Sequence, residues 1–180
     1  MEKEVETTKI LGKLKEKKVG VFCDGSNLFF ASKENHWQID LGKLKEFFEK
    51  CYDLQFINYY LTIPAKNDSD YYGTQNFIEK ISPFVSIKSK DLKYIPIGSQ
   101  IMKKGNMDVE IVLDVVRTIK NLDVVIIMSG DSDFLELGKY VIKENGKHII
   151  YMSYERSMSW ELRKCWHIFL ENIKEKIILT

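Results

Sequence analysis

The stretch DVVIIMSGDSDF, residues 123–134, holds the clearest strand signal of the chain. A short apolar run that ends at a turn-forming glycine is typical of a strand buried in a parallel sheet. Two carboxylates follow this run, Asp131 and Asp133, with one serine between them. Because isolated charges are costly to bury, two acids at the end of a buried strand need a physical explanation.

Strand and helix signals alternate on both sides of this stretch. Short apolar or β-branched runs predict strands, and amphipathic runs with capping residues predict helices. The other predicted strands are 18–23, 55–63 and 147–152, with a hairpin or two ragged strands formed by FVSIKS (84–89) and LKYIPI (92–97). The predicted helices are 40–51 with Asp40 as its cap, 71–81 after the NDSD run, 105–120 opened by Asn106, 132–145 closed by Gly146, and 159–170.

This alternation predicts an α/β fold with a doubly wound, mostly parallel sheet of about five strands and helices on both faces. We expect the strand order 3-2-1-4-5, in which strands 18–23 and 123–128 are neighbours at the point where the winding reverses. Residues 1–17 are expected to form a polar N-terminal extension, with at most one loose helix, and 18–180 the folded domain.

Composition limits the class of protein. The chain of 180 residues is 44% hydrophobic, and its N-terminus is charged throughout, unlike a secretory signal. No apolar run reaches the ~18–20 residues of a membrane span. The three cysteines lie far apart, which favours a reducing compartment and predicts a cytoplasmic location. Because the net charge is only +1, binding to nucleic acid requires a local cluster of lysines.

The predicted strand order brings carboxylates from three segments to one edge of the sheet. Asp24 directly follows the first strand, Asp131 and Asp133 follow strand 123–128, and Asp108 near the start of the 105–120 helix can reach the same crevice. Four carboxylates in one crevice repel one another unless a cation neutralises them. Oxygen ligands favour hard divalent cations, so we expect Mg²⁺ or Mn²⁺ as the cofactor, with all four aspartates as ligands.

Each of these acids also has a purely structural interpretation. Asp133 can cap the helix that follows it, and Asp108 can favour its own helix N-terminus electrostatically. Asp114 lies about 240° around the helix from Asp108 and cannot point at the same ion. It is either an outer residue that orients a ligand or part of a solvated helix face.

Three motifs in this order resemble the NYN domain, of the LabA-like branch of the PIN-like nuclease superfamily. They are VGVFCDGSN (19–27), KKGNMDVEIVLDVV (103–116) and VVIIMSGDSDFLELGKYVIKENGKHIIYM (124–152). The family's D-x-x-N motif corresponds to Asp24 and Asn27, its K-G-x-D helix start to Lys104, Gly105 and Asp108 with one extra residue, and its S-G-D-S-D-F motif to Ser129–Phe134. The segment 162–170 departs from the family's closing motif, with His167 where an acidic residue is usual.

The resemblance implies a PIN-like Rossmannoid fold and a metal-dependent ribonuclease activity. Asp24, Asp108 and Asp131 are then expected to bind the metal directly or through water, and Asp133 to complete the shell or position the attacking water. Asn27 is expected to hydrogen-bond a metal-bound water or a phosphate oxygen, and the alternative is a turn residue that tolerates unusual backbone angles.

Single-stranded RNA is the expected substrate, and lysines at the rim of the crevice would attract its phosphates. The candidate substrate-binding residues are Lys88, Lys90, Lys103, Lys104 and Ser129, and further basic candidates are Lys93, Lys33 and His36. Each lysine alone is also explained as a solvated surface charge, and Ser129 by turn chemistry. Tyr71, Tyr72 and Tyr94 can stack on bases, but they can also be packing residues.

Two other classes of function remain open. A non-catalytic NYN module that binds RNA or protein in a regulatory role would keep the fold without the activity. A phospho-receiver domain would place its reacting aspartate where Asp24 lies, but it needs acidic neighbours that Cys23 and Ser26 do not supply. A second copy of the chain is a further expected partner, through residues 1–18.

Overall fold

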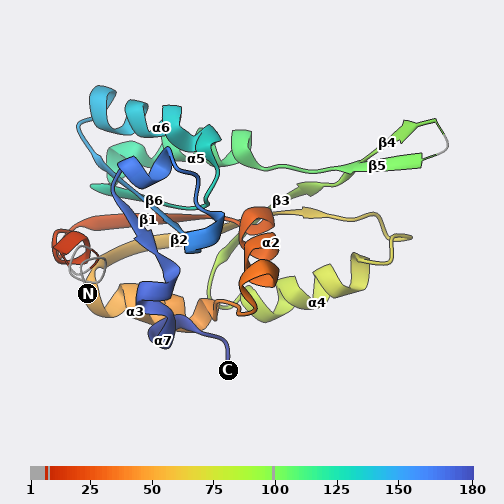
Figure 1. The fold of residues 1–180 in the computed structure, drawn as a ribbon, viewed down its shortest axis with the longest axis horizontal. Helices are drawn as coiled ribbons and strands as arrows, with labels where there is room; N and C mark the ends of the chain where they lie inside the picture. The colour runs from red at the N-terminus through yellow and green to blue at the C-terminus, as the bar shows by residue number, and fades with distance from the viewer. Residues whose placement is uncertain (1–6, 8, 99) are drawn as a thin grey trace.

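The computed structural model describes residues 7, 9–98 and 100–180, and it has a central parallel sheet with helices on both faces (Figure 1). The sheet has six strands in the order β3-β2-β1-β6-β7-β8, and every pair of neighbours is parallel. Its strands are β1 (Lys18–Asp24), β2 (Asp53–Ile63), β3 (Ser86–Asp91), β6 (Val124–Met128), β7 (His148–Ser153) and β8 (His167–Phe169).

The α/β class and the mostly parallel sheet are confirmed, as is the pairing of the first strand with DVVIIM. The count of about five strands and the order 3-2-1-4-5 differ from the structure, because β8 extends the sheet beyond β7. The predicted helix 159–170 is therefore wrong. Leu162–Lys164 makes one 3₁₀ turn there and Leu170 begins another, while Ile168 and Phe169 between them become buried beside β7. Burial at the sheet edge outweighs local helix propensity in this segment.

A second, two-stranded sheet is formed by β4 (Lys93–Ile97) and β5 (Gln100–Lys104), which pair antiparallel. It projects from the body of the molecule, and we call residues 93–104 the arm (Figure 1). The predicted hairpin between FVSIKS and LKYIPI is wrong, because β3 pairs in parallel with β2 instead. Gly98 has φ +61, a conformation that glycine adopts without strain at the turn of the arm.

The helices are α2 (Gly25–Asn35), α3 (Leu41–Cys51), α4 (Tyr71–Ile81), α5 (Asp108–Thr118), α6 (Leu135–Lys139) and α7 (Lys174–Ile177). The Asp40 side chain caps α3 by accepting a hydrogen bond from the Lys43 amide, as predicted. The N-cap position of α5 is Met107 rather than Asn106. The predicted helix 132–145 begins as a 3₁₀ turn, continues as α6 and ends as a π-helical turn, which Gly146 closes at φ +61.

Two hydrophobic cores lie on the two faces of the sheet. Buried residues of α5 and α6, among them Ile111 and Leu137, pack on one face, and those of α3 and α7 pack on the other (Figure 1). Ile10 and Leu14 of the N-terminal segment are buried in this second core, so the described end of that segment packs against its own chain. Residues 1–6 and 8 of the predicted extension lie outside the described part. Within that part, no helix has the length and hydrophobicity that a membrane span requires.

Candidate metal centre

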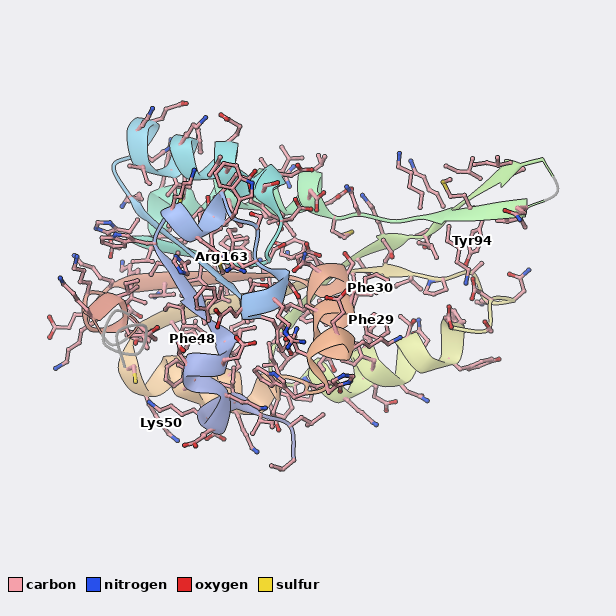
Figure 2. All side chains as sticks on the ribbon, viewed as in Figure 1. Phe29, Phe30, Phe48, Lys50, Tyr94 and Arg163 are labelled. Atoms are coloured by element: carbon pink, nitrogen blue, oxygen red, sulfur yellow. The ribbon has the colours of Figure 1, made fainter. Side chains whose placement is uncertain are left out.

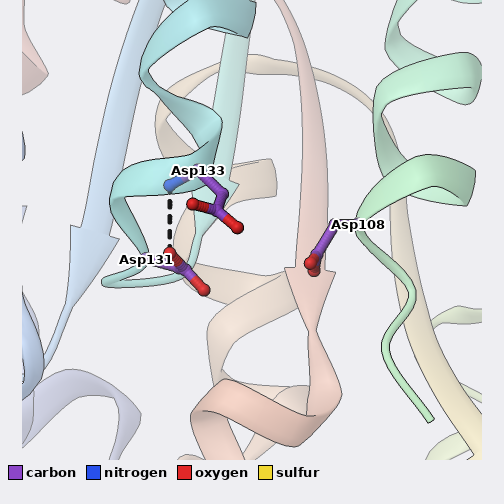
Figure 3. Close-up of side chains that lie close together, drawn as sticks. All are labelled: Asp108, Asp131 and Asp133. Carbon is purple, nitrogen blue, oxygen red and sulfur yellow. Dashed lines mark hydrogen bonds between the residues drawn. The ribbon is translucent and has the colours of Figure 1, made fainter.

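Three aspartate side chains converge at the carboxyl ends of β1 and β6 (Figure 3). Asp131 and Asp133 belong to the turn after β6, and Asp108 is the first residue of α5. Each offers one carboxylate oxygen, and these oxygens lie within 4.8 Å of one another. The Asp131 carboxylate also accepts a 3.0 Å hydrogen bond from the Asp133 amide, which orients the turn. Two of the three segments that were predicted to bring acids to this edge, those of Asp108 and of Asp131 and Asp133, therefore meet in the structure.

The Asp108 carboxyl is in a strongly negative environment. Burial, followed by the nearby charges of Asp24, Asp131 and Asp133, raises its pKa to about 6, while Lys90 opposes them weakly. A carboxylate surrounded by other carboxylates binds a proton or a cation more tightly than it would in water. A set of oxygen ligands with excess negative charge fits a hard divalent cation.

Asp24 lies beside this group rather than within it. Its side chain is only 4% exposed and accepts three hydrogen bonds, from the Ser26 hydroxyl, the Asn27 amide and the Ser129 hydroxyl. Among the neighbouring aspartates, Asp24 nevertheless contributes most to the raised pKa of Asp108. A carboxylate has about four acceptor positions, so three hydrogen bonds leave one free for a further contact. Its role as a metal ligand stays a prediction.

Asn27 and Ser129 connect the loops that follow β1 and β6. The Asn27 side-chain oxygen accepts a 3.0 Å hydrogen bond from the Gly130 amide, and the Ser129 hydroxyl lies between Asp24 and the Asp131 amide. Ser129 is fully buried, so a substrate does not reach its hydroxyl in this structure. The predicted substrate contact of Ser129 is thus replaced by a positioning role, because its hydrogen bonds hold two of the acids in place.

The sequence of this chain matches a known family over most of its length. Residues 18–172 match the NYN domain family. The chain belongs to the NYN domain family. The NYN family is a family of PIN-like nucleases, and this agrees with the resemblance of the three sequence motifs.

Two known proteins are similar to this NYN domain. The chain is 26% identical over 157 residues to the low amplitude and bright protein LabA of Synechococcus elongatus, covering 86% of this chain and 83% of LabA. The fold is similar to the crystal structure of a Vibrio parahaemolyticus protein of unknown function, with a TM-score of 0.70 and 20% identity. That likeness covers 91% of this chain and 97% of the other, and it shows a shared fold.

Ion pairs divide four of the predicted lysines of the NYN domain into two groups. Lys90 contacts both carboxylate oxygens of Glu110 at 2.7 Å, and Lys103 pairs with Asp68 at 2.8 Å and Asp70 at 3.2 Å. These two lysines are therefore partly neutralised. Within the described residues, Lys88 on β3 and Lys104 on β5 are exposed and make no ion pair.

Asp114 of the NYN domain lies away from the carboxylate group. Its carboxylate accepts a 3.0 Å hydrogen bond from the Tyr60 hydroxyl and pairs with Arg117 at 3.2 Å. The Asn58 side chain donates in turn to the Tyr60 hydroxyl. This network joins α5 to β2 and so helps to set the position of Asp108 at the start of α5.

Sequence reasoning did not pair Lys93 with Lys104, although the two lie directly opposite each other in the arm. Two like charges in a cross-strand pair repel each other, so this pairing is unfavourable without an anion. The signal that would have revealed it is the Gly98–Ser99 dipeptide between two short β-rich runs, which favours a tight hairpin at that point of the chain. Tyr94, a candidate for base stacking, instead donates its hydroxyl to Asp68 at 2.6 Å.

Proposed function

We propose that this NYN domain is a metal-dependent ribonuclease that hydrolyses phosphodiester bonds of single-stranded RNA. The observation that carries the proposal is the convergence of Asp108, Asp131 and Asp133 at the edge of the sheet. The raised pKa of Asp108 supports it, because the uncompensated negative charge there favours cation binding. Membership of the NYN family, a family of PIN-like nucleases, supports RNA as the class of substrate.

In this proposal the three converging aspartates hold the cation, and Asp24 completes the ligand set from the buried side. A Mg²⁺ or Mn²⁺ ion bound there supplies an activated water and stabilises negative charge on the phosphate oxygens. Asp133 is the most exposed of the three. It would orient the attacking water, accept the proton that this water loses and release that proton to solvent. Asn27 accepts a hydrogen bond from the Gly130 amide through its side-chain oxygen, and its side-chain N–H groups would donate to a metal-bound water or a phosphate oxygen.

The reaction we propose is an in-line attack of water on the phosphorus atom of the RNA backbone. The bond between phosphorus and the 3′ oxygen breaks, so the products carry a 5′-phosphate and a 3′-hydroxyl. The protein residues contribute mainly by positioning the reactants and by stabilising charge electrostatically, and these two effects account for most of the catalysis in phosphoryl transfer.

Lysines of β3 and of the arm are proposed to draw the RNA towards the acids. Lys88 and the Lys93–Lys104 pair carry charge without a carboxylate partner among the described residues, so they are the strongest candidates for phosphate contacts. Lys90 and Lys103 are secondary candidates, because each already pairs with an acid. A phosphate between Lys93 and Lys104 would relieve their mutual repulsion.

Cleavage of labelled single-stranded RNA in Mn²⁺ or Mg²⁺ tests the proposal. Asp24→Asn and Asp131→Asn should each lower the rate by about a hundredfold or more, since even outer-shell changes around a metal cost 10–100-fold. Asp53→Asn, an exposed aspartate at the start of β2, is the matched control and should leave the rate unchanged.

Two outcomes decide against the proposal. Cleavage that continues unchanged in both variants would exclude the metal mechanism. RNA binding by the unmodified chain without cleavage in either metal would favour the alternative, a non-catalytic NYN module with a regulatory role.

A further inference from the structure

Two phenylalanines of α2 are exposed to solvent, and in the sequence they follow shortly after Asp24 and Asn27. Phe29 is 48% exposed and Phe30 62% exposed, and their rings contact each other at a centroid distance of 5.5 Å in a T-shaped arrangement (Figure 2). The buried side of α2 is made by Leu28, Ala31 and Ser32, so the core does not use these rings. Exposed aromatic side chains that the fold does not need are candidates for binding.

The helix spacing places these rings on the face of α2 that carries Ser26, a residue that contacts Asp24. Ser26 donates a 2.9 Å hydrogen bond to Asp24, and residues three and four positions later lie above it on an α-helix. Phe29 and Phe30 therefore follow Ser26 along one face, about 5–6 Å farther along the axis. Because Ser26 contacts Asp24, rings one helical turn beyond it are placed where we expect a nucleotide next to a phosphate at the acids to extend.

A positive charge continues the same face of α2. Lys33 lies seven positions after Ser26, and its amino group is 4.1 Å from the centre of the Phe29 ring. Within the described residues Lys33 forms no ion pair with a carboxylate. The face thus presents a hydroxyl, two aromatic rings and a cation in sequence, leading away from the metal centre. We call Ser26, Phe29, Phe30 and Lys33 the α2 face.

We propose that the α2 face binds single-stranded RNA, with the rings of Phe29 and Phe30 stacking on nucleobases next to the scissile phosphate. Lys33 contacts a phosphate farther along the same strand. The inference rests on the proposed ribonuclease function and names the protein surface that holds its substrate. Aromatic rings beside basic residues are the usual means of binding unpaired bases without sequence preference.

A protein partner fits the α2 face less well. A stable interface between proteins buries about 800 Å² on each side, whereas an aromatic side chain buries about 150–250 Å². Two rings with one lysine form a surface of the size of one or two bases. The direct continuity with the carboxylates also favours an occupant that carries a phosphate, since the cation expected there binds phosphate oxygens.

Binding of a labelled single-stranded RNA oligonucleotide to the full chain tests the inference, with fluorescence anisotropy as the readout. We expect Phe30→Ala to weaken binding about tenfold and the double change Phe29→Ala, Phe30→Ala about a hundredfold, in line with one stacked base for each ring. Phe30→Trp should keep the affinity. Phe84→Ala, which removes a ring of similar exposure (43%) before β3, is the matched control and should bind as the unmodified chain does.

An RNA with abasic sites gives a second readout that a folding defect cannot imitate. Abasic RNA should bind the unmodified chain as weakly as intact RNA binds the double variant, and the double variant should not distinguish the two RNAs. Equal affinity of the double variant and the unmodified chain for intact RNA would overturn the inference. A change of oligomeric state in the double variant, with unchanged RNA affinity, would also overturn it and would assign the rings to contact with a second copy.

The result separates this inference from the proposed activity. RNA cleavage with no dependence on the two rings would leave the ribonuclease proposal intact and refute the α2 face. Ring-dependent RNA binding without cleavage in any metal would support the α2 face and refute the ribonuclease proposal.

Discussion

The Ser129 hydroxyl donates a 3.0 Å hydrogen bond to Oδ2 of Asp24, although the two residues are 105 positions apart in the chain. They meet because β1 and β6 are parallel neighbours, which brings their carboxyl ends to the same edge of the sheet. Oδ1 of Asp24 accepts two further hydrogen bonds, from Ser26 and Asn27. The carboxylate of Asp24, next to the proposed metal centre, is therefore buried and held in one orientation by three hydrogen bonds.

Ser129→Ala is expected to affect both stability and activity. It removes the donor to the buried Oδ2 of Asp24, which should lower the free energy of unfolding by about 1–3 kcal/mol. The same loss of orientation should lower RNA cleavage about tenfold, as for outer-shell changes at metal sites. Urea unfolding and a cleavage assay measure the two effects. Ser89→Ala on the exposed edge strand β3 is the control, and equal losses in both variants would contradict the positioning role.

Gly130→Ala and Gly73→Ala should change stability in opposite directions. A methyl group at Gly130 would meet the Ser157 carbonyl and the Met158 backbone, which cannot move away easily, so we expect a loss of about 1–3 kcal/mol. Gly73 lies within α4 with open space around it, so alanine there should add about 0.5–1 kcal/mol by helix propensity. Thermal or urea unfolding measures both. A stable Gly130→Ala variant would show that the turn after β6 is not tightly packed.

In metal-free buffer, Asp108→Asn should stabilise the fold at neutral pH. The pKa of Asp108 rises from 3.8 to about 6 on folding, mainly through burial and then through the other acids. The folded state therefore binds this proton more tightly than the unfolded state, and its stability falls as pH rises between these two values. Because the side chain is partly exposed, we expect a gain of only about 1 kcal/mol for the variant at pH 7, which disappears near pH 4.

With added Mg²⁺ or Mn²⁺, the unmodified chain should become more stable than the Asp108→Asn variant. A cation that binds only the folded chain stabilises it by about 2.7 kcal/mol at a hundred times its Kd, and the melting temperature should rise accordingly. Asp108→Asn and Asp131→Asn should show little or no rise. A thermal shift series against metal concentration measures this, and identical shifts in the variants would place the cation elsewhere.

Asp68→Asn should loosen the arm. Asp68 accepts hydrogen bonds from Tyr94 and Lys103, which join the arm to the loop after β2, and the contact with Lys103 holds the pKa of Asp68 well below its usual range. This contribution is present above about pH 4 and is lost as the pH falls further and Asp68 is protonated. Hydrogen exchange of residues 93–97 should become faster in the variant, with Asp53→Asn as the control. Unchanged exchange would mean that strand pairing alone holds the arm.

Lys104→Ala and Lys93→Ala should each weaken binding to RNA in a salt-dependent way. Loss of one phosphate contact should reduce the slope of log affinity against log salt by about 0.7 for a single strand. Lys50→Ala on α3, a lysine paired with Glu46 on the surface, is the control and should leave the slope unchanged. Binding titrations at three or more salt concentrations measure the slopes. An unchanged slope for both arm lysines would remove them from the RNA path.

Local signals were enough for most elements of this protein. The α3 helix was predictable because Asp40 caps it and its apolar residues recur at helical spacing, and both features depend only on neighbours in the chain. The strand β6 was predictable because its short apolar run is rich in β-branched residues, which fit the middle of a parallel sheet. The neighbouring positions of β1 and β6, and with them the convergence of Asp108 and Asp131, followed from the handedness of βαβ connections.

The remaining features depend on distant partners, which the sequence does not specify. The strand β8 forms because β7 presents a free edge, and the arm forms because 93–97 pairs with 100–104 rather than with 84–89. The different roles of Lys90, Lys103 and Lys104 depend on which acids lie within reach, and this is decided only by the packed chain.

The sequence by itself determined the α/β class, the order of most elements and the set of acids at the edge of the sheet. Only the tertiary structure decided which of those acids share oxygens within 4.8 Å and that three hydrogen bonds hold Asp24 beside them. The physical reason is the separation along the chain of the residues that interact. Periodicity and capping act within a few residues, whereas hydrogen bonds, ion pairs and exposure at a site depend on segments that meet only when the sheet is complete.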